Sequence, residues 1–198
     1  GQISIKSPAT GRRRAVLSRK IKEESMKYSK LLVGAACGVA ALVAYAGGTP
    51  DFVKFPHAYD AKFTNYTKMN RAGSAAVAKM YANDVALASY AKGMPAAPGS
   101  KIVMEVYKPK KDADGKPVVG SDGVNVPDKL AAIAVMERRD AWPGGLAQGD
   151  QVGGWAFAIF NPDGSPKQND LTCVVCHTPY EKQDYLFSHQ KLVDFASR

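Results

Sequence analysis

The stretch Cys173-Val174-Val175-Cys176-His177 limits what this chain can be more than any other part of the sequence. The 198-residue chain contains three cysteines, and two of them stand here, three positions apart, with a histidine directly after the second. Cysteines at this spacing occur in zinc sites, in redox-active dithiols, in short disulfides and at attachment points for covalently bound haem. The remaining sequence has to decide among these four possibilities.

Three of the four fit poorly. A structural zinc site normally needs four ligands, and the other histidines, His57 and His189, are isolated in the sequence. A redox dithiol is expected at the start of a helix in a βαβ unit, whereas this pair lies near the C-terminus after a β-rich region. A disulfide between Cys173 and Cys176 would leave His177 without a role.

Haem attachment gives all three residues a role. Two thiols separated by two residues reach the two vinyl groups of one haem, and the adjacent imidazole then lies where it can bind the iron. We therefore predict one covalent haem c, held by Cys173 and Cys176, with His177 as the metal ligand.

The N-terminal part of the chain indicates export. Residues 26–46 begin with a short basic segment, continue with an apolar run and end in Ala44-Tyr45-Ala46, the pattern of a cleaved secretory signal. An uncleaved membrane anchor is the alternative, since the apolar run is only slightly shorter than a membrane span. Residues 1–25 precede this signal and are interpreted as a disordered basic extension. We expect a periplasmic protein whose functional domain is residues 47–198, in agreement with haem attachment outside the cytoplasm.

The charge distribution argues against nucleic acid as a partner. The net charge is +9, but residues 1–46 carry nine Lys or Arg and two Glu, and residues 47–198 carry eighteen basic and sixteen acidic side chains. The basic character therefore belongs to the leader, and the folded part shows no charge pattern typical of binding DNA or RNA.

Hydrophobic patterning predicts an α+β fold, mainly an antiparallel β-sheet with a few short helices in a single haem-binding domain. Alternating apolar residues indicate three strands, and a segment rich in Gly, Pro and Asp indicates a long loop. Apolar spacing over residues 73–93 is compatible either with one helix or with a strand over 75–82 followed by a short helix capped by Asp84. The three expected strands are residues 101–107, 130–137 and 153–160, and the loop is residues 109–129.

With these segments in place, the sequence resembles the cytochrome P-460 family and its relatives, the β-sheet cytochromes c-prime. The resemblance covers about residues 52–195 and is carried by residues 99–107, 155–160 and 173–177, together with Asp184-Tyr185-Leu186-Phe187. It implies a mostly antiparallel β fold, a homodimer and a high-spin haem with an open distal site. It also implies that the chain binds nitric oxide or oxidises hydroxylamine.

The resemblance points to a departure from the family pattern in the strand at residues 101–107. Hydroxylamine-oxidising members have a lysine before the glutamate, cross-linked to the porphyrin, whereas this chain has Met104 before Glu105. Lys101 is three positions away and on the opposite strand face, so we expect no cross-link. Glu105 is the candidate catalytic proton acceptor, with Glu137 as a further candidate. The apolar residues expected to line the distal site are Met104, Val106, Met136, Trp155 and Phe157.

Three functions are compatible with this pattern. The first is an open haem site that binds a small nitrogen compound such as nitric oxide, and the second is oxidation of hydroxylamine. The third is plain electron transfer to a redox partner protein, with a methionine as sixth ligand; the candidates are Met94, Met104 and Met136. Arg138 and Arg139 are candidates for pairing with the haem propionates, and His57 and His189 are expected at the surface or at helix caps.

Overall fold

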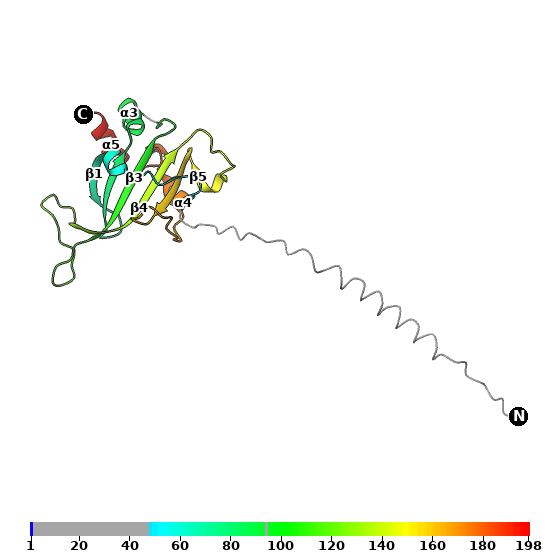
Figure 1. Cartoon of the computed structure of the whole chain (residues 1–198), viewed down its shortest axis with the longest axis horizontal. Helices are drawn as coiled ribbons and strands as arrows, with labels where there is room; N and C mark the ends of the chain where they lie inside the picture. The colour runs from blue at the N-terminus through cyan, green and yellow to red at the C-terminus, as the bar shows by residue number, and fades with distance from the viewer. Residues whose placement is uncertain (2–47, 94) are drawn as a thin grey trace. The chain divides into compact units, whose positions relative to one another are not determined.

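A six-stranded antiparallel sheet is the main element of the domain, as the computed structural model shows (Figure 1). The structure describes Gly1 and residues 48–93 and 95–198, so the predicted extension, signal segment and Met94 lie outside the described residues. Within the described residues, no helix is long and apolar enough to cross a membrane. The predicted α+β fold is therefore confirmed.

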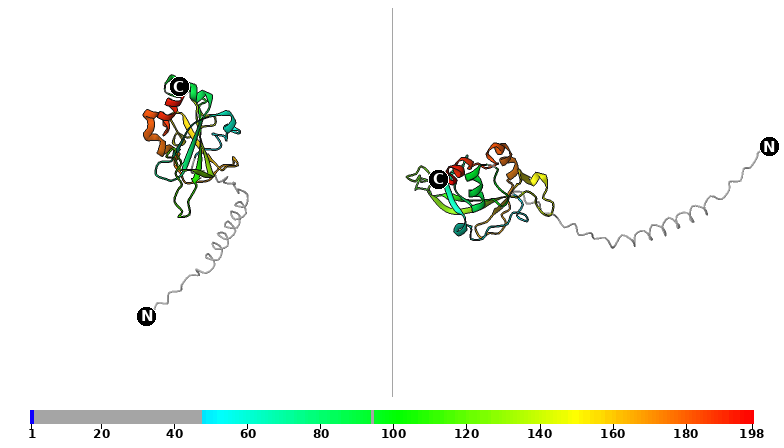
Figure 2. Two further views of the ribbon diagram at one scale, coloured as in Figure 1. Left: turned by 90° about the vertical axis from the view of Figure 1, so that its left-hand side faces the viewer. Right: turned by 90° about the horizontal axis from the view of Figure 1, so that it is seen from above.

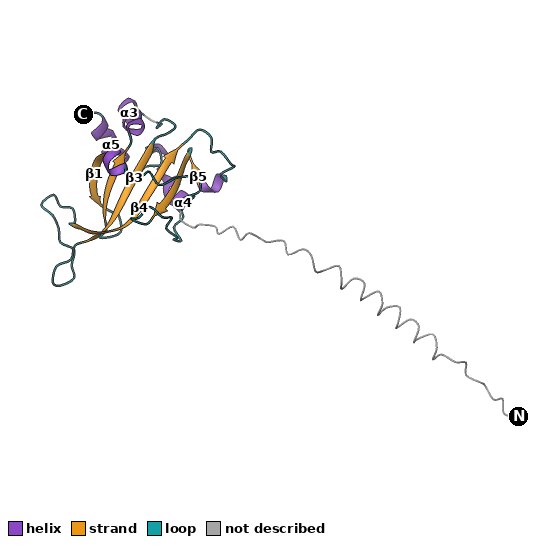
Figure 3. Ribbon diagram, in the orientation of Figure 1, coloured by secondary structure: helices purple, strands orange, loops and turns teal. Residues whose placement is uncertain are grey.

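The strands follow one another in the sheet in the order β1-β2-β3-β4-β6-β5. They are β1 (Thr64–Asn70), β2 (Val77–Ala82), β3 (Lys101–Pro109), β4 (Pro127–Arg138), β5 (Gln151–Val152) and β6 (Trp155–Phe160). The helices around the sheet are short (Figure 3). They are α2 (Tyr59–Lys62), α3 (Asp84–Lys92), η1 (Gln148–Asp150), α4 (Cys173–His177), η2 (Thr178–Gln183) and α5 (His189–Ala196).

Side chains alternate along β3, β4 and β6, so the sheet has two different faces. Ile102, Met136 and Phe157 belong to one hydrophobic cluster, and Cys173 and Val174 of α4 pack against the same cluster. We call this side the motif face. The opposite side, which we call the back face, carries a second cluster that includes Val103, Val135 and Ala158.

Different segments of the chain cover the two faces, as Figure 2 shows. The motif face is covered by α3 and by the C-terminal helices, through buried residues such as Tyr90, Leu186 and Leu192. The back face is covered by the segment that leads into α2, through Val53 and Tyr59, and by the loop after β4. Burial on both sides is what a sheet of apolar strands requires, and it leaves the Cys-His motif on one side only.

The segment over residues 73–93 forms a strand and a short helix, and the single long helix is wrong. β2 pairs with β1 and β3 on its two sides, so the sheet supplies hydrogen bonds that a helix would have made internally. The cap of α3 is Asn83 rather than Asp84, because the Asn83 side chain accepts a hydrogen bond from the Ala86 backbone N–H at 3.0 Å. α3 ends at Gly93, with φ of 103°.

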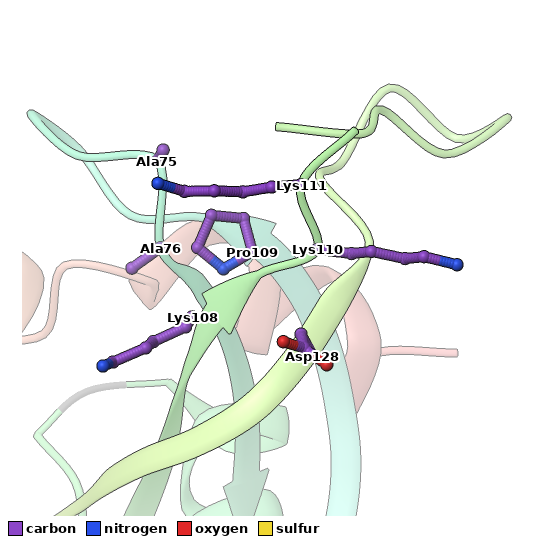
Figure 4. Close-up of a pocket in the computed structure, with 7 residues that line it drawn as sticks. All are labelled: Ala75, Ala76, Lys108, Pro109, Lys110, Lys111 and Asp128. Carbon is purple, nitrogen blue, oxygen red and sulfur yellow. The ribbon is translucent and has the colours of Figure 1, made fainter. Parts of the chain in front are cut away.

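The loop between β3 and β4 is a long hairpin that enters β4 at Pro127, the opposite end of β4 from the residues that pair with β6, which are 133–138. A hollow of about 650 Å³ lies at the base of this hairpin and is lined mainly by lysines (Figure 4). The amino groups of Lys108, Lys110 and Lys111 point in different directions, and Asp128 lies among them. The hollow therefore does not form a converging anion site.

Glu105 lies on the back face, only 6% exposed. Its carboxylate accepts hydrogen bonds from the hydroxyl groups of Tyr59 at 2.7 Å, Tyr81 at 3.0 Å and Tyr107 at 3.0 Å. Burial, followed by the negative charge of Glu105 and its hydrogen bond, raises the pKa of Tyr107 to about 12. This cluster joins α2, β2 and β3 and makes the back face a structural layer.

We predict that the domain loses stability as the pH rises from about 10 to about 12. The unfolded chain releases a tyrosine proton near pH 10, whereas the folded state holds the Tyr107 proton up to a pKa of about 12. The unfolded state therefore binds fewer protons in this window, and the free energy of unfolding falls with pH. Urea unfolding across this range should show a shallower decline for Tyr107→Phe and for Glu105→Gln. Equal slopes in wild type and both variants would contradict the interpretation.

Candidate functional site

The Cys-His motif forms a single helical turn, α4, against the motif face. The Cys176 backbone N–H donates to the Thr172 carbonyl at 3.2 Å, and the Thr178 hydroxyl donates to the Val174 carbonyl at 2.8 Å. Helical spacing brings positions i, i+3 and i+4 to one side of the turn, which are Cys173, Cys176 and His177. Both thiols are free, with Cys173 half-buried and Cys176 exposed.

The His177 ring is held in a defined orientation. Its Nδ1 atom lies 2.6 Å from the Tyr185 carbonyl oxygen, and because a carbonyl can only accept, Nδ1 must carry the proton. The ring centroid lies 4.5 Å from those of Phe157 and Phe187, so aromatic side chains flank the imidazole. This arrangement leaves Nε2 as the ring nitrogen with a free lone pair, which is the form that binds a metal.

Burial changes the protonation of two motif residues. Burial lowers the pKa of His177, and the bond to the Tyr185 carbonyl opposes that effect only in part. A lowered pKa keeps the imidazole neutral at physiological pH, as metal ligation requires. Burial also raises the pKa of the Cys173 thiol, so this side chain remains a thiol.

The turn after η2 contains Tyr185, whose carbonyl accepts the hydrogen bond from His177. Asp184 and Tyr185 both have left-handed backbone conformations, with φ of 50° and 61°. The Tyr185 ring lies directly over Gly153 in the β5–β6 turn, where any Cβ would overlap the ring. Gly153 therefore makes room for Tyr185.

Part of the motif face is apolar but incompletely covered. The row Ile102, Met136 and Phe157 is buried, whereas the next row along the same strands, Met104, Ala134 and Ile159, is only half-buried. Val106 and its partner Ala132 continue this half-buried strip. We call these five residues, Met104, Val106, Ala132, Ala134 and Ile159, the apolar strip. A flat apolar group beside α4 would find a matching surface here.

The structure brings some predicted site residues together and separates others. Met104, Trp155 and Phe157 lie on the motif face with the cysteines and His177. Trp155 is fully buried, and its indole N–H donates to Asp184 at 3.2 Å, so Trp155 supports the turn beneath the site. Glu105 lies on the back face, away from the motif.

The other charged candidates are also bound elsewhere. Glu137 is buried between Lys101, at 3.3 Å, and Arg139, at 2.8 Å. Arg139 also lies over the Trp142 ring. Arg138 is half-buried and donates through Nε to the Gly153 carbonyl at 3.3 Å, beside the turn under Tyr185. Of the two arginines, Arg138 is therefore the one close to the site.

The two remaining histidines differ in their surroundings. His57 is exposed and packs edge-on against Phe55, near the back face. His189 begins α5 and packs against Tyr90 with ring centroids 5.7 Å apart. Within the described residues, no three His, Cys, Asp or Glu side chains gather in a way that could hold a metal ion.

Reasoning from the sequence missed three parts of the site. The Tyr185 carbonyl, the Phe187 ring and the Asp184 carboxylate all lie in the segment that follows the motif. The sequence feature that could have indicated these residues is the stretch Asp184-Tyr185-Leu186-Phe187, which contributed to the family resemblance but was assigned no role. A backbone acceptor has no sequence signature, so its role became visible only in the structure.

Comparison with known protein families gives a match over most of the domain. The family model described as Cytochrome P460 matches residues 56–188, well over half of the chain, from the segment before α2 to the residue before α5. The matched region includes the whole sheet, α4 and the turn at Asp184 and Tyr185. No curated protein matches the sequence.

We predict that Gly153→Ala destabilises the domain by about 1–3 kcal/mol, because Gly153 has a φ of 57° and an added Cβ overlaps the Tyr185 ring. The matched control is Gly149→Ala in the same region, where no heavy atom lies within 4 Å of an added Cβ. The control should change the free energy of unfolding by less than about 0.5 kcal/mol. Urea unfolding with unchanged m-values measures both, and equal midpoints would show that Tyr185 does not depend on Gly153.

Proposed function

The chain belongs to the cytochrome P460 family, a family of haem-binding cytochromes, and on this basis we propose that it is an exported protein with one covalent haem c that binds a small nitrogen compound. The observation that carries the proposal is the His177 ring, whose Nδ1 is bound to a backbone carbonyl while Nε2 remains available beside two free thiols.

The residues present fit a covalently attached haem. Cys173 and Cys176 stand on one side of a helical turn. Each S–H would add across one haem vinyl group, so that sulfur bonds to one vinyl carbon and the hydrogen goes to the other. The apolar strip is supported as the contact surface for the porphyrin by its position on the motif face and its incomplete burial. Arg138, half-buried near the turn at Gly153, is the proposed partner of a propionate.

His177 would serve as the iron ligand. The carbonyl of Tyr185 orients the ring and increases the basicity of Nε2, while Phe157 and Phe187 exclude water from its sides. When bound, the haem would supply a redox-active iron that can take a further ligand besides His177.

Binding of nitric oxide is favoured over oxidation of hydroxylamine. Oxidation requires a group that accepts protons, and both glutamate candidates, Glu105 and Glu137, lie on the back face with their oxygens bound to other side chains. Asp184, on the motif face, is also occupied by hydrogen bonds. A neutral diatomic ligand needs no proton transfer. Met104 stands where a cross-linking lysine would be expected, and Lys101 is paired with Glu137.

A second function, plain electron transfer, is favoured by one observation. Met104 lies half-buried on the motif face, where its thioether sulfur is a possible sixth ligand. Met136 lies on the same face but is buried within the core cluster. The two functions differ in whether the iron would keep a free coordination site for a small ligand or bind a methionine.

The cellular setting is part of the proposal. Export through residues 26–46 would deliver the chain to the periplasm, where a redox partner protein would exchange electrons with the haem. An N-terminal membrane anchor is the alternative. The family likeness supports a homodimer.

Haem attachment is tested by replacing the cysteines. The α band of the pyridine adduct should move to longer wavelength in Cys173→Ala and in Cys176→Ala, and to the position of unattached haem in the double variant. Val175→Ala is the matched control, because Val175 is in the same turn and 68% exposed. Denatured wild-type protein should retain its haem. Release of the haem from the wild type, or no shift in the variants, would exclude the proposed attachment.

The ligand site is tested by spectroscopy of the reduced protein. We expect a five-coordinate, high-spin iron that binds nitric oxide, an unchanged spectrum in Met104→Leu and in Met136→Leu, and no turnover of hydroxylamine with an artificial electron acceptor. A low-spin spectrum with a methionine-to-iron band that disappears in Met104→Leu would establish the electron-transfer function instead. Hydroxylamine turnover would show that another group accepts the protons.

A further inference from the structure

Asp184 is a buried acid whose two carboxylate oxygens are both used. It is 5% exposed. Oδ2 accepts hydrogen bonds from the Tyr90 hydroxyl at 3.0 Å and from the Ala96 backbone N–H at 2.8 Å, and Oδ1 accepts one from the Trp155 indole N–H at 3.2 Å. Among the described residues, no Lys or Arg forms an ion pair with it. The burial of this acid therefore depends on these three neutral donors.

The three donors come from separate parts of the chain. Tyr90 belongs to α3, Ala96 to the loop before β3, and Trp155 to β6. Burial, and after it the negative charge of Asp184, raises the pKa of Tyr90, so its hydroxyl remains a proton donor. Asp184 thus ties the turn after η2 to α3 and to the sheet.

The anchored residue stands directly before the one that contacts His177. Asp184 and Tyr185 are two consecutive non-glycine residues in the left-handed region, with φ of 50° and 61°. This conformation is unfavourable for such residues and persists only where surrounding contacts impose it. The Tyr185 N–H donates to the Tyr180 carbonyl at 2.8 Å, and the Tyr185 carbonyl then faces His177.

The two contacts that hold the His177 ring, with the Phe157 ring and with the Tyr185 carbonyl, both depend on residues of β6. Phe157, against which the ring packs, is two residues from Trp155 on the same strand and the same face. The bond between Trp155 and Asp184 therefore sets how far the Tyr185 carbonyl lies from the Phe157 ring. A change in that separation would rotate the imidazole or weaken its hydrogen bond.

We propose that Asp184 is a positioning residue for His177. Through its three hydrogen bonds it fixes the Tyr185 carbonyl, which in turn sets the orientation of the imidazole and the basicity of Nε2 toward the haem iron. This inference rests on the proposed function, in which His177 is the iron ligand. Outer groups that hold a metal-ligating histidine commonly change metal affinity or activity by about 10–100-fold when replaced.

A purely structural role would make Asp184 equivalent to other buried hydrogen-bonded groups on the same face. Tyr66 provides the comparison. Its hydroxyl is buried on the motif face and lies 2.7 Å from the Ser188 Oγ, and it forms no hydrogen bond with the Asp184 carboxylate or the His177 ring among the described residues. Tyr90→Phe and Tyr66→Phe each remove one buried hydroxyl from the same cluster, but only the first removes a donor to Asp184.

The experiment uses the full chain as purified, with the variants Asp184→Asn, Trp155→Phe, Tyr90→Phe and Tyr66→Phe. In Asp184→Asn the amide oxygen can still face Tyr90 and Ala96, but the amide NH₂ then opposes the Trp155 N–H and that bond is lost. Trp155→Phe removes the indole donor and, because Trp155 is fully buried, also leaves a small cavity, whereas Tyr90→Phe removes a hydroxyl alone. If Asp184→Asn does not fold, the Trp155 and Tyr90 variants decide the question.

Three readouts report on His177 itself: the iron–histidine stretching band, the midpoint potential and the exchange of the Nδ1 proton. The iron–histidine stretching band of the ferrous protein should move to lower wavenumber in Asp184→Asn, and the midpoint potential should rise by about 59 mV, the one-electron equivalent of a tenfold loss of ferric ligation. The nuclear magnetic resonance signal of the His177 Nδ1 proton, recorded on the carbon monoxide adduct, should exchange faster with solvent. Trp155→Phe and Tyr90→Phe should show smaller shifts in the same directions.

Tyr66→Phe should lower the melting temperature as Tyr90→Phe does, but leave the stretching band, the potential and the Nδ1 signal unchanged. The inference would be overturned if the folded Asp184, Trp155 and Tyr90 variants contain haem and show the same stretching band, potential and Nδ1 exchange as the wild type. That result would leave the proposed function intact. Protein purified without haem would overturn the proposed function. In that case the Nδ1 exchange rate of the haem-free protein still decides: unchanged exchange in the variants overturns the positioning role, and faster exchange supports it.

Discussion

The hydrogen bond between His177 Nδ1 and the Tyr185 carbonyl is the interaction on which the site depends. It connects the short helix that carries the motif to a turn eight residues later, and it determines which ring nitrogen is free. A helix of five residues, such as α4, is not stable alone. Its position comes from packing of Cys173 and Val174 on the sheet and from this one bond.

The sheet separates two kinds of chemistry. The back face holds acids that are fully engaged, Glu105 with three tyrosine hydroxyls and Glu137 with Lys101 and Arg139. The motif face offers apolar side chains, two thiols and one neutral imidazole. A surface of this kind suits a flat apolar cofactor and a neutral ligand better than a reaction that releases protons.

Much of the fold could be predicted because strand patterns are local. The alternation in residues 101–107 correctly placed Met104 and Glu105 on opposite faces, and the alternation in residues 153–160 correctly placed Trp155 and Phe157 on one face. β1 was missed because its sequence, Thr64–Asn70, is largely polar and carries little alternating signal. The choice between strand and helix over residues 73–93 could not be made locally, because alanine is compatible with both. Pairing of β2 with two neighbouring strands decided it.

The sequence by itself determined that Cys173, Cys176 and His177 share one side of a helical turn, because spacing along one turn is a local property. Only the tertiary structure decided which face of the sheet the motif meets, and therefore that Met104 shares its side and Glu105 does not. It also decided that the Tyr185 backbone carbonyl accepts the hydrogen bond from His177 Nδ1, next to an Asp184 side chain that is bound to Trp155. These contacts join residues far apart in the sequence, and packing of the sheet and helices, rather than any local pattern, brings them together.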